Sequence, residues 1–375
     1  MSRYIDIHVL QTVPPANLNR DDTGSPKSAV YGGVRRTRVS SQAWKRAVRQ
    51  DFPSLLAPED LGSRTKRIVE LVARELMQRD LEEAEALEAA TGVLEQAGIK
   101  VEVPKRKAKD EGAKPESRAL VFLGAHQIRE LADVALARRA GGLDDKEFKA
   151  RAKRAAVESQ SIDLALFGRM VAESPDLNVD AAVQVAHAIG VQAGDNEFDY
   201  YTAVDDLNTD AETGAGMIGT IEFTSATLYR YATVNVASLF ENLGDAEATE
   251  RAVNAFVTSF VRSMPSGKQN TFANRTLPEV VLVMVRDTQP VSLVQAFEQP
   301  VVAEPGTSPS AVAAERLVRK AQQVEAMYDE QPVEVLAIHD GGVTSLSEWV
   351  SPSTLTEVAG RAGKLAVASV AEESA

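Results

Sequence analysis

The pattern of hydrophobic and polar positions divides this chain into strands and helices. An alternation with a period of two over residues 4–11 predicts a half-buried strand, because successive strand side chains face opposite sides. A β-branched and aromatic run over 218–235 predicts two strands with a turn near Ser225, and an apolar run predicts a buried strand over 279–286. Helical periods predict helices over residues 42–50, 63–90, 118–139, 144–160, 247–264 and 310–330. A strand near 333–339 and a final helix complete the pattern.

The order of these elements predicts an α+β fold. The mostly helical block 59–190 separates the first strand and helix from the later elements. Without it the order is strand, helix, strand, strand, helix, strand, which is the ferredoxin-like order that the RNA-recognition fold shares. Within the block, residues 100–116 are charged and poor in apolar side chains, so we expect an exposed, mobile loop there.

Two segments depart from this regular pattern. Residues 14–33 contain several Gly and Pro and predict a long irregular loop, which in a folded protein is usually functional or disordered. Residues 198–223 run from an aromatic strand through a polar, Gly-rich turn into another strand, which predicts a protruding β-hairpin. An ordinary surface hairpin is the alternative to a finger that presents Tyr200, Tyr201 and Val204 to a partner chain or to nucleic-acid bases.

Composition narrows the class of protein. The chain has 375 residues, of which 44% are hydrophobic, so it can bury a sizeable core. It has no Cys, which excludes disulfides and thiolate metal sites and fits a reducing compartment. The first residues lack the apolar stretch of a signal peptide, and no apolar run reaches the length of a membrane helix. We therefore expect a soluble, cytoplasmic protein with no membrane partner.

Charge singles out residues 20–49. This stretch has a net charge of +6 on a chain whose net charge is −13. Glycines and hydroxyls lie between the cations, and Ser40 and Ser41 can cap a following helix on which Lys45 and Arg49 lie one turn apart. A solvated charged face is the alternative to a polyanion site. A contact with phosphates would give affinity that falls with salt but does not read sequence.

Catalytic signals are poor in comparison. The four His are scattered, and His187 is expected on a helix as a core or capping residue. The adjacent pairs Asp21-Asp22 and Asp205-Asp206 point to different sides, and no nucleophile elbow occurs. The loop 265–270 contains Gly-Lys-Gln but lacks the full phosphate-loop spacing, so a turn is the better interpretation. We predict no catalytic residue, no metal site and no cofactor.

A set of spaced motifs runs through most of the chain. The N-terminal motif comprises Leu18-Asn19-Arg20-Asp21-Asp22, Gly32-Gly33, Arg35-Arg36, Arg38, Ser40-Ser41-Gln42, Lys45-Arg46-Ala47 and Arg49. The later motifs are Ile162–Leu166, Gly168–Met170, Ala186–Ala188, Thr202–Leu207, Tyr229–Ala232, Glu241–Gly244, Lys268-Gln269 and Ala296–Glu298. In this order, the motifs resemble those of the CasC (Cse-type) backbone subunit of the type I-E CRISPR surveillance complex, Cascade.

The resemblance implies a hand-like fold and a role without catalysis. The palm would be RNA-recognition-like and comprise residues 1–58 and 223–375, with helical fingers over 59–190 and a hairpin thumb over 191–222. Copies would polymerise along a CRISPR guide RNA, together with other Cascade subunits, and present kinked segments for pairing with target DNA in antiviral defence. The implied RNA-binding residues are Arg20, Lys27, Ser40, Gln42, Lys45, Arg46, Arg49, Met170, Tyr200, Tyr201, Thr202, Val204, Lys268 and Gln269.

This sequence also departs from the family. After Ala296–Glu298, where relatives can carry lysines that reach nucleic acid, it has Gln299, Pro300, Val302 and Glu304. It has Tyr200-Tyr201 where relatives can show Trp-Phe. Two other functions stay open at this point. One is a metal-dependent ribonuclease of a related RNA-guided complex that uses Asp21 or Asp22, and the other is a small-molecule enzyme with a basic loop.

Overall fold

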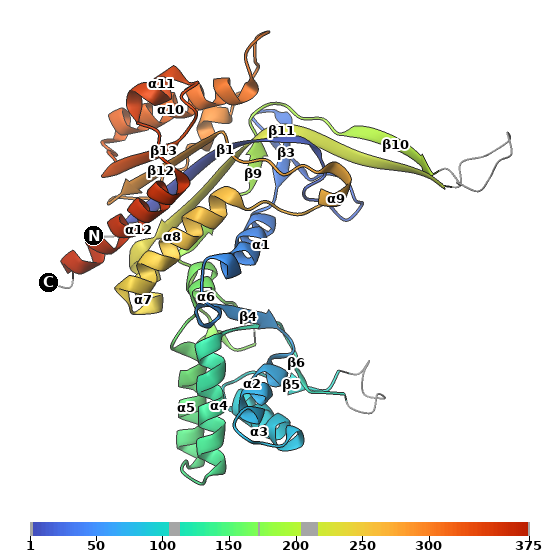
Figure 1. Ribbon diagram of the computed structural model, residues 1–375, viewed down its shortest axis with the longest axis vertical. Helices are drawn as coiled ribbons and strands as arrows, with labels where there is room; N and C mark the ends of the chain where they lie inside the picture. Colours follow the sequence, from blue (N-terminus) through green and yellow to red (C-terminus); the bar gives the residue numbers. More distant parts are fainter. Residues whose placement is uncertain (1–2, 105–112, 172, 204–216, 374–375) are drawn as a thin grey trace. The chain divides into compact units, whose positions relative to one another are not determined.

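The computed structural model describes residues 3–104, 113–171, 173–203 and 217–373 (Figure 1). The chain divides into two compact units. The first comprises Met1–Asp51, Gln184–Val234 and Val253–Ala375, and the second comprises Phe52–Val183 and Asn235–Ala252. None of the described helices is both long enough and apolar enough to cross a membrane.

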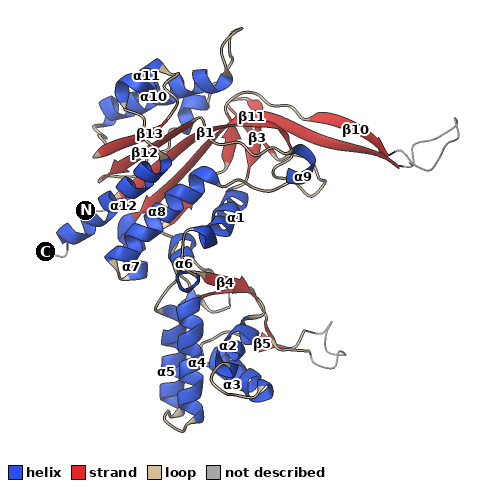
Figure 2. Ribbon diagram, viewed as in Figure 1, coloured by secondary structure: helices blue, strands red, loops and turns tan. Residues whose placement is uncertain are grey.

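The first unit is built on a mixed, largely antiparallel sheet. Its strands are β1 (Tyr4–Ala16), β2 (Ser28–Tyr31), β3 (Val34–Val39), β8 (Val183–Val185), β9 (Ala188–Gly190), β10 (Glu197–Ala203), β11 (Met217–Asn235), β12 (Val280–Arg286) and β13 (Glu334–Ile338). The strands lie in the order β13-β12-β1-β11-β9-β3-β2, and β8 and β10 also pair with β11. β10 and β11 extend beyond the rest of the sheet as a two-stranded hairpin (Figure 2).

Helices cover both faces of this sheet (Figure 1). The helices are α1 (Ser41–Asp51), α8 (Ala246–Arg262, of which residues 253–262 belong to this unit), α9 (Gln269–Phe272), α10 (Pro309–Tyr328), α11 (Thr344–Trp349), α12 (Leu355–Glu373) and the 3-10 turn η4 (Val294–Phe297). α10 and α11 pack against Leu10, Tyr229 and Leu282 on one face. All seven residues of β12 are buried, as its apolar run predicted, because side chains on both faces of this strand are covered.

The second unit is mostly helical, and its core lies between α2, α3, α4 and α5. Its helices are α2 (Ile68–Met77), α3 (Glu83–Gln96), α4 (Ala125–Arg139), α5 (Asp145–Val157), α6 (Ile162–Phe167), α7 (Val236–Leu243), η1 (Phe52–Ser54), η2 (Pro58–Asp60) and η3 (Pro175–Leu177). Two small sheets pair β4 (Gly62–Thr65) with β7 (Val121–Gly124) and β5 (Val101–Glu102) with β6 (Glu116–Ser117).

Several predictions of local structure were wrong. β11 is one continuous strand, with no turn at Ser225. β1 is buried on both faces rather than one, because helices cover both sides and its polar residues Asp6 and His8 bond to buried partners. The expected irregular loop over 14–33 contains the end of β1 and all of β2, and the helix expected from residue 118 begins at Ala125, after β7. Of the expected loop 100–116, residues 105–112 lie outside the described residues.

Candidate nucleic-acid interface

Three backbone segments bring Arg20, Lys27 and Arg38 together. The Lys27 N–H donates to the Asn19 carbonyl oxygen at 2.9 Å, and the Arg38 N–H donates to the Lys27 carbonyl oxygen at 2.9 Å. An isolated bridge pairs Arg20 with Pro26. The Asn19 Oδ1 also accepts from the Ser40 N–H at 2.8 Å, which ties this layer to the start of α1. Residues almost 20 positions apart in sequence therefore become neighbours.

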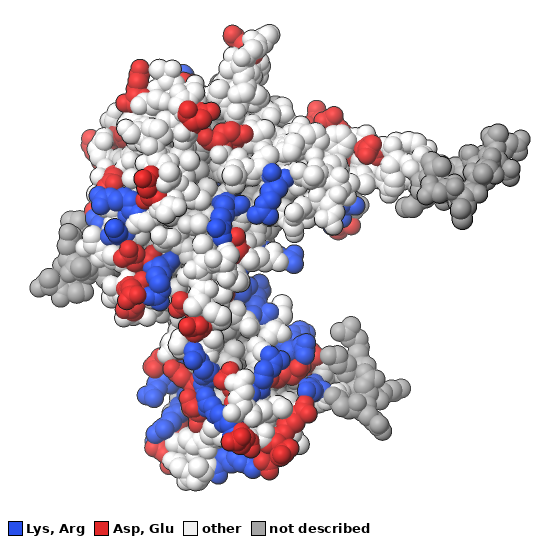
Figure 3. All heavy atoms as spheres, viewed as in Figure 1, with Lys and Arg blue, Asp and Glu red and all other residues white. Residues whose placement is uncertain are grey.

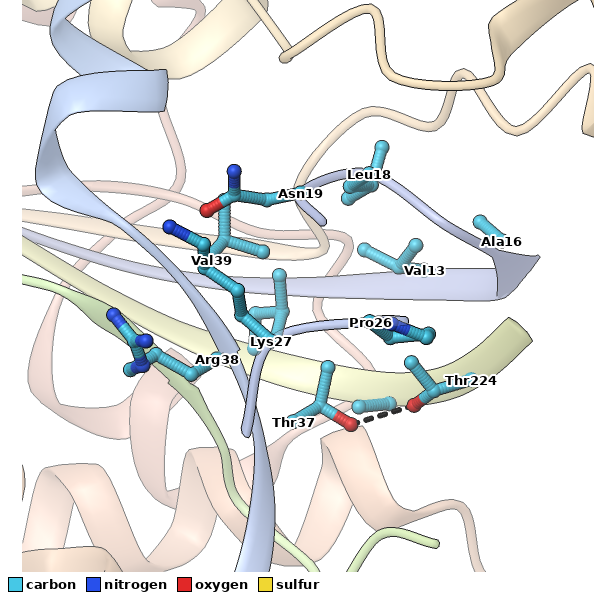
Figure 4. Close-up of a pocket in the computed structure, with 12 residues that line it drawn as sticks. Val13, Ala16, Leu18, Asn19, Pro26, Lys27, Thr37, Arg38, Val39 and Thr224 are labelled. Carbon is cyan, nitrogen blue, oxygen red and sulfur yellow. Dashed lines mark hydrogen bonds between the residues drawn. The ribbon is translucent and has the colours of Figure 1, made fainter. Parts of the chain in front are cut away.

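An apolar floor supports these cations (Figure 4). Val13, Leu18 and Val39 line a small cavity beneath the Lys27 and Arg38 segments. Figure 4 shows that the charged ends of Lys27 and Arg38 extend toward the same side, away from the cavity. Such side chains bury their aliphatic stems and keep their charges in solvent. This geometry presents two cations to the same ligand.

Helix α1 adds a second row of polar side chains. Trp44, Ala47 and Val48 form its buried face, as the sequence predicted. Gln42 and Arg46 are exposed, and Lys45 and Arg49 are half-buried one turn apart. Burial lowers the pKa of the Lys45 ammonium group, because a charge loses hydration there. A phosphate next to Lys45 would restore a favourable partner to that charge.

Ser40 has a structural task at the start of α1. Its side chain is buried, and its Oγ accepts from the Ala43 N–H at 3.3 Å. This confirms the predicted helix cap. Ser40 is thus the cap of α1, and its predicted contact with RNA stays a prediction.

Buried contacts hold α1 on the sheet. The Arg230 guanidinium carbon lies 3.7 Å from the centroid of the Trp44 ring, and Arg230 Nη1 donates to Gln11 Oε1 at 2.6 Å. Burial lowers the pKa of Arg230 to about 9. At the other end of the helix, the Asp51 carboxylate accepts from the Arg262 Nε at 2.7 Å and from the Ser259 hydroxyl at 2.8 Å. The row of Lys45 and Arg49 is therefore fixed at both ends.

Arg36 belongs to the basic stretch but not to its surface. Its side chain is completely buried, and burial lowers its pKa. Its guanidinium donates to the carbonyl oxygens of Tyr31, Gly190, Val191, Phe297 and Glu298. Gly32 turns the β2–β3 hairpin at a φ of +59°, and a Cβ there would lie 1.6 Å from the Glu298 carbonyl oxygen. Arg36 therefore shapes the interface from beneath.

The hairpin carries an apolar face. By register, Phe198, Tyr200 and Thr202 share one side with Ile218, and the first two are 67% and 63% exposed. Tyr201 lies on the other side and packs over Gly219. Val204, the remaining predicted residue of this segment, lies outside the described residues.

The root of the hairpin is bonded to the basic loop. The Glu222 carboxylate accepts from the Ser25 hydroxyl and the Asn196 amide, both at 2.8 Å, and the Glu222 carbonyl accepts from the Asn17 amide at 2.9 Å. The hairpin and the basic loop are thus connected through one residue.

The remaining predicted residues lie at different places. Lys268, at a φ of +51°, is half-buried, and Gln269 is exposed. The preceding Gly267 packs so closely that a Cβ there would lie 2.2 Å from the Leu18 carbonyl oxygen, which places this loop beside the Arg20 segment. Met170 belongs to the second unit and is 83% exposed. Its grouping with the basic side chains stays a prediction.

One residue near these cations was missed by sequence reasoning. His187 is exposed between β8 and β9 rather than on a helix, so the expected helix and core position were wrong. Its Nδ1 accepts from the Ser41 N–H at 3.3 Å, at the start of α1. Burial lowers the pKa of His187, and the neighbouring Arg38 and Lys27 charges lower it further. The sequence carries no local signal for this contact, because 146 positions separate His187 from Ser41.

Acidic groups near the basic loop have local tasks. The Asp21 Oδ1 accepts from the Thr23 hydroxyl at 2.7 Å and from the Thr23 and Ser25 N–H groups at 2.9 and 3.0 Å. The Thr23 hydroxyl contributes most to lowering the pKa of Asp21. Asp21 therefore closes a turn. Across the described part of the chain, no group of three or more His, Asp and Glu could hold a metal ion.

Acidic and basic side chains are intermixed on the visible face of the first unit, and no uniformly basic coat is seen there (Figure 3). They are likewise intermixed on the second unit. A polyanion that binds this face would therefore need a local group of cations rather than the overall charge of the face.

Comparison with known proteins gives a consistent result. The profile of the CT1975-like protein family matches residues 5–358. A chain from a structure described as "CRISPR RNA-guided surveillance complex, pre-nicking" shares 34% identity at a TM-score of 0.82, over 97% of this chain and all of that chain. A chain from another "CRISPR RNA-guided surveillance complex" shares 31% identity at a TM-score of 0.72, over 98% of this chain and 99% of that chain. No curated protein matches the chain significantly.

Proposed function

The chain belongs to the CT1975-like protein family, and we propose on this basis that it is a non-catalytic backbone subunit of a CRISPR RNA-guided surveillance complex of type I-E. The observation that carries the proposal is the convergence of Arg20, Lys27 and Arg38, from three backbone segments, beside the cations of α1. Contacts of this kind suit phosphate oxygens and would hold RNA of any sequence.

The proposed role is geometric. Copies of the chain would assemble along a guide RNA, and each would grip the backbone with Arg20, Lys27, Gln42, Lys45, Arg46 and Arg49. Lys268 and Gln269 would contribute from the adjacent loop. Guide bases would then pair with target DNA, so sequence would be read by pairing and not by this protein. Other subunits of the complex would complete the particle.

We assign the parts of a hand to the observed elements. The run β12-β1-β11-β9, with the helices α1 and α8, has the strand order 4-1-3-2 of a ferredoxin-like palm when β9 is taken as the second strand. The second unit would be the fingers and would bring Met170 to a kinked nucleotide. The β10–β11 hairpin would be the thumb, with Tyr200, Tyr201, Thr202 and Val204 as its contact surface.

The direct test is the nucleic acid that accompanies the protein when it is purified from its own host. We expect high absorbance at 260 nm relative to 280 nm, from a short RNA of uniform length. Protein free of RNA that also fails to bind added RNA would contradict the proposal. Cleavage of the bound RNA on addition of a divalent metal would instead favour a ribonuclease.

The thumb assignment has its own test. Replacing the segment between Tyr201 and Gly219 with a short Gly-containing turn leaves the register of the lower hairpin intact. We expect a folded protein that binds RNA but assembles into disordered particles, as seen by electron microscopy. Particles indistinguishable from those of the natural chain would show that the β10–β11 hairpin does not act as a thumb.

A further inference from the structure

The ring of His187 is fixed in one tautomer by its neighbours. Its Nδ1 lies 3.3 Å from the Ser41 backbone nitrogen, which can only donate. The Arg38 Nη1, also a donor, lies 3.4 Å from the same Nδ1. Since two donors face Nδ1, this atom must be the unprotonated acceptor, and the neutral ring carries its proton on Nε2. His187 is exposed, so that N–H is a donor available to a ligand.

Arg38 is held in position beside this ring. Its Nε donates to the Ser28 carbonyl oxygen at 3.2 Å, and its Nη1 is the group that faces His187. These contacts fix the plane of the guanidinium and leave its Nη2 edge without a partner among the contacts of the described residues. A planar guanidinium with a fixed orientation is well suited to phosphate oxygens.

The surroundings of His187 favour an anion. The charged groups that act on its ring are Arg38 and Lys27, both cations, and the ring also loses hydration through partial burial. Figure 4 shows the charged ends of Lys27 and Arg38 on the same side. Two cations and a neutral N–H donor, from the three segments around Lys27, β3 and the β8–β9 link, therefore border one place on the surface.

We propose that Arg38 and His187 form a phosphate clamp for the RNA backbone, with Arg38 as the charged donor and neutral His187 as an Nε2–H donor. This inference rests on the proposed function and deepens it, because neither residue is among the RNA contacts that the sequence predicts. The phosphodiester would lie next to the start of α1, between the Lys27 cation and the row of Lys45 and Arg49.

Three variants separate the parts of the clamp. His187→Asn keeps an acceptor for the Ser41 N–H but removes the outward donor, whereas His187→Gln can place an amide N–H near the Nε2 position. Arg38→Gln removes one charge. With a single-stranded RNA of mixed sequence and the full chain, we expect His187→Asn to weaken binding about 10-fold, since a hydrogen bond to a charged group is lost. His187→Gln should recover most of this loss.

Salt and pH distinguish a neutral from a charged donor. Arg38→Gln should reduce the slope of log affinity against log salt by about 0.7, the value for one phosphate contact of a single strand. His187→Asn should leave that slope unchanged. Binding by the natural chain should be flat between pH 8.5 and 7.5, where a histidine whose pKa is lowered from 6.5 is neutral. A rise on acidification that disappears in His187→Asn would overturn the neutral-donor assignment.

The outcomes also separate this inference from the proposed function. Thermal unfolding of each variant checks that the fold is retained. If the natural chain binds RNA but His187→Asn and Arg38→Gln bind equally well, the clamp is overturned and the subunit role stands. Equal losses in His187→Asn and His187→Gln would show a merely structural histidine and would also overturn it. If the natural chain binds no RNA at all, both proposals fail.

Discussion

Two sets of cations in this fold differ in their burial. Arg36 is completely buried and donates to carbonyl oxygens of three segments, and Arg230 is buried against Trp44. Arg38 and Lys45, by contrast, are only half-buried, and Arg46 on α1 is exposed, so these cations form the exposed set. The buried set gives the interface its shape, and the exposed set gives it charge.

This difference matters for how a basic stretch is interpreted. The charge of +6 over residues 20–49 includes Arg36, which no ligand can reach without disrupting the turn at Gly32. An arginine that satisfies several buried carbonyls is a structural residue, because removing it leaves those acceptors without donors. The comparison predicts that the two sets respond to different measurements, one to unfolding and the other to RNA binding.

The largest expected effect comes from Arg36. Arg36→Met should lower the free energy of unfolding by about 3–5 kcal/mol, because buried acceptors lose their donor. Urea unfolding measures this change. Arg35→Met is the matched control, since Arg35 is the exposed neighbour and its Nε donates only to the Ser28 hydroxyl among the described contacts. That control should change stability by less than about 0.5 kcal/mol. Equal free energies of unfolding for the two variants would show that Arg36 is not a structural residue.

Lowering the pH should reduce the free energy of unfolding, because the buried His8 stays uncharged in the folded chain. Burial, with a smaller effect of Arg286, lowers the pKa of His8 from 6.5 to about 3. Below pH 6.5 the unfolded chain therefore binds a proton that the folded chain does not. Stability from His8 is present above pH 6.5 and falls by up to about 1.4 kcal/mol per pH unit as pH drops toward 3.

A pair of histidine variants isolates this contribution. His8→Asn should flatten the fall in unfolding free energy between pH 6.5 and 4, even if the variant is less stable overall. His126→Asn, which changes an exposed histidine, should retain the slope of the natural chain. An unchanged slope in His8→Asn would show that His8 is protonated in the folded state.

Charge reversal tests the exposed set. Lys45→Glu with Arg49→Glu should weaken RNA binding by about 10- to 100-fold at low salt, and equally for unrelated RNA sequences. Arg319→Glu with Lys320→Glu reverses two charges on α10 and serves as the control, with little change expected. A loss confined to particular RNA sequences would mean that these side chains read bases.

The smallest effect is expected from a single exposed cation. Arg46→Gln should weaken binding only about two- to fivefold and reduce the salt slope by about 0.7, because Arg46 would supply one phosphate contact among several. Stability should stay within about 0.5 kcal/mol. A large loss of stability would show that Arg46 is a structural residue, like the cations of the buried set.

Local patterns in the sequence predicted much of the fold. The apolar stripe of Trp44, Ala47 and Val48, the cap by Ser40 and the buried run of β12 all depend on neighbours within a few residues, and the structure confirms them. The sequence did not predict a continuous β11, because Ser225 is a residue type that is common in turns. Pairing with strands distant in sequence keeps the backbone extended there.

The interface was harder to predict than its charge. Arg36 and Arg38 are two positions apart and chemically identical, and only the tertiary packing of residues near 190 and 298 buries the first of them. His187 meets the start of α1 across 146 positions, so no spacing along the chain reveals it. The sequence can count cations, but contacts between distant segments decide which of them face a ligand.

We propose that cations at the surface, held in place by buried residues, bind an RNA backbone without reading its sequence. The most direct test measures the affinity of the full chain for two single-stranded RNAs of the same length and unrelated sequence over a range of salt. We expect equal affinities for the two RNAs and one steep slope of log affinity against log salt, about 0.7 per phosphate contact. A shallow slope, or affinities that differ strongly between the two RNAs, would contradict it.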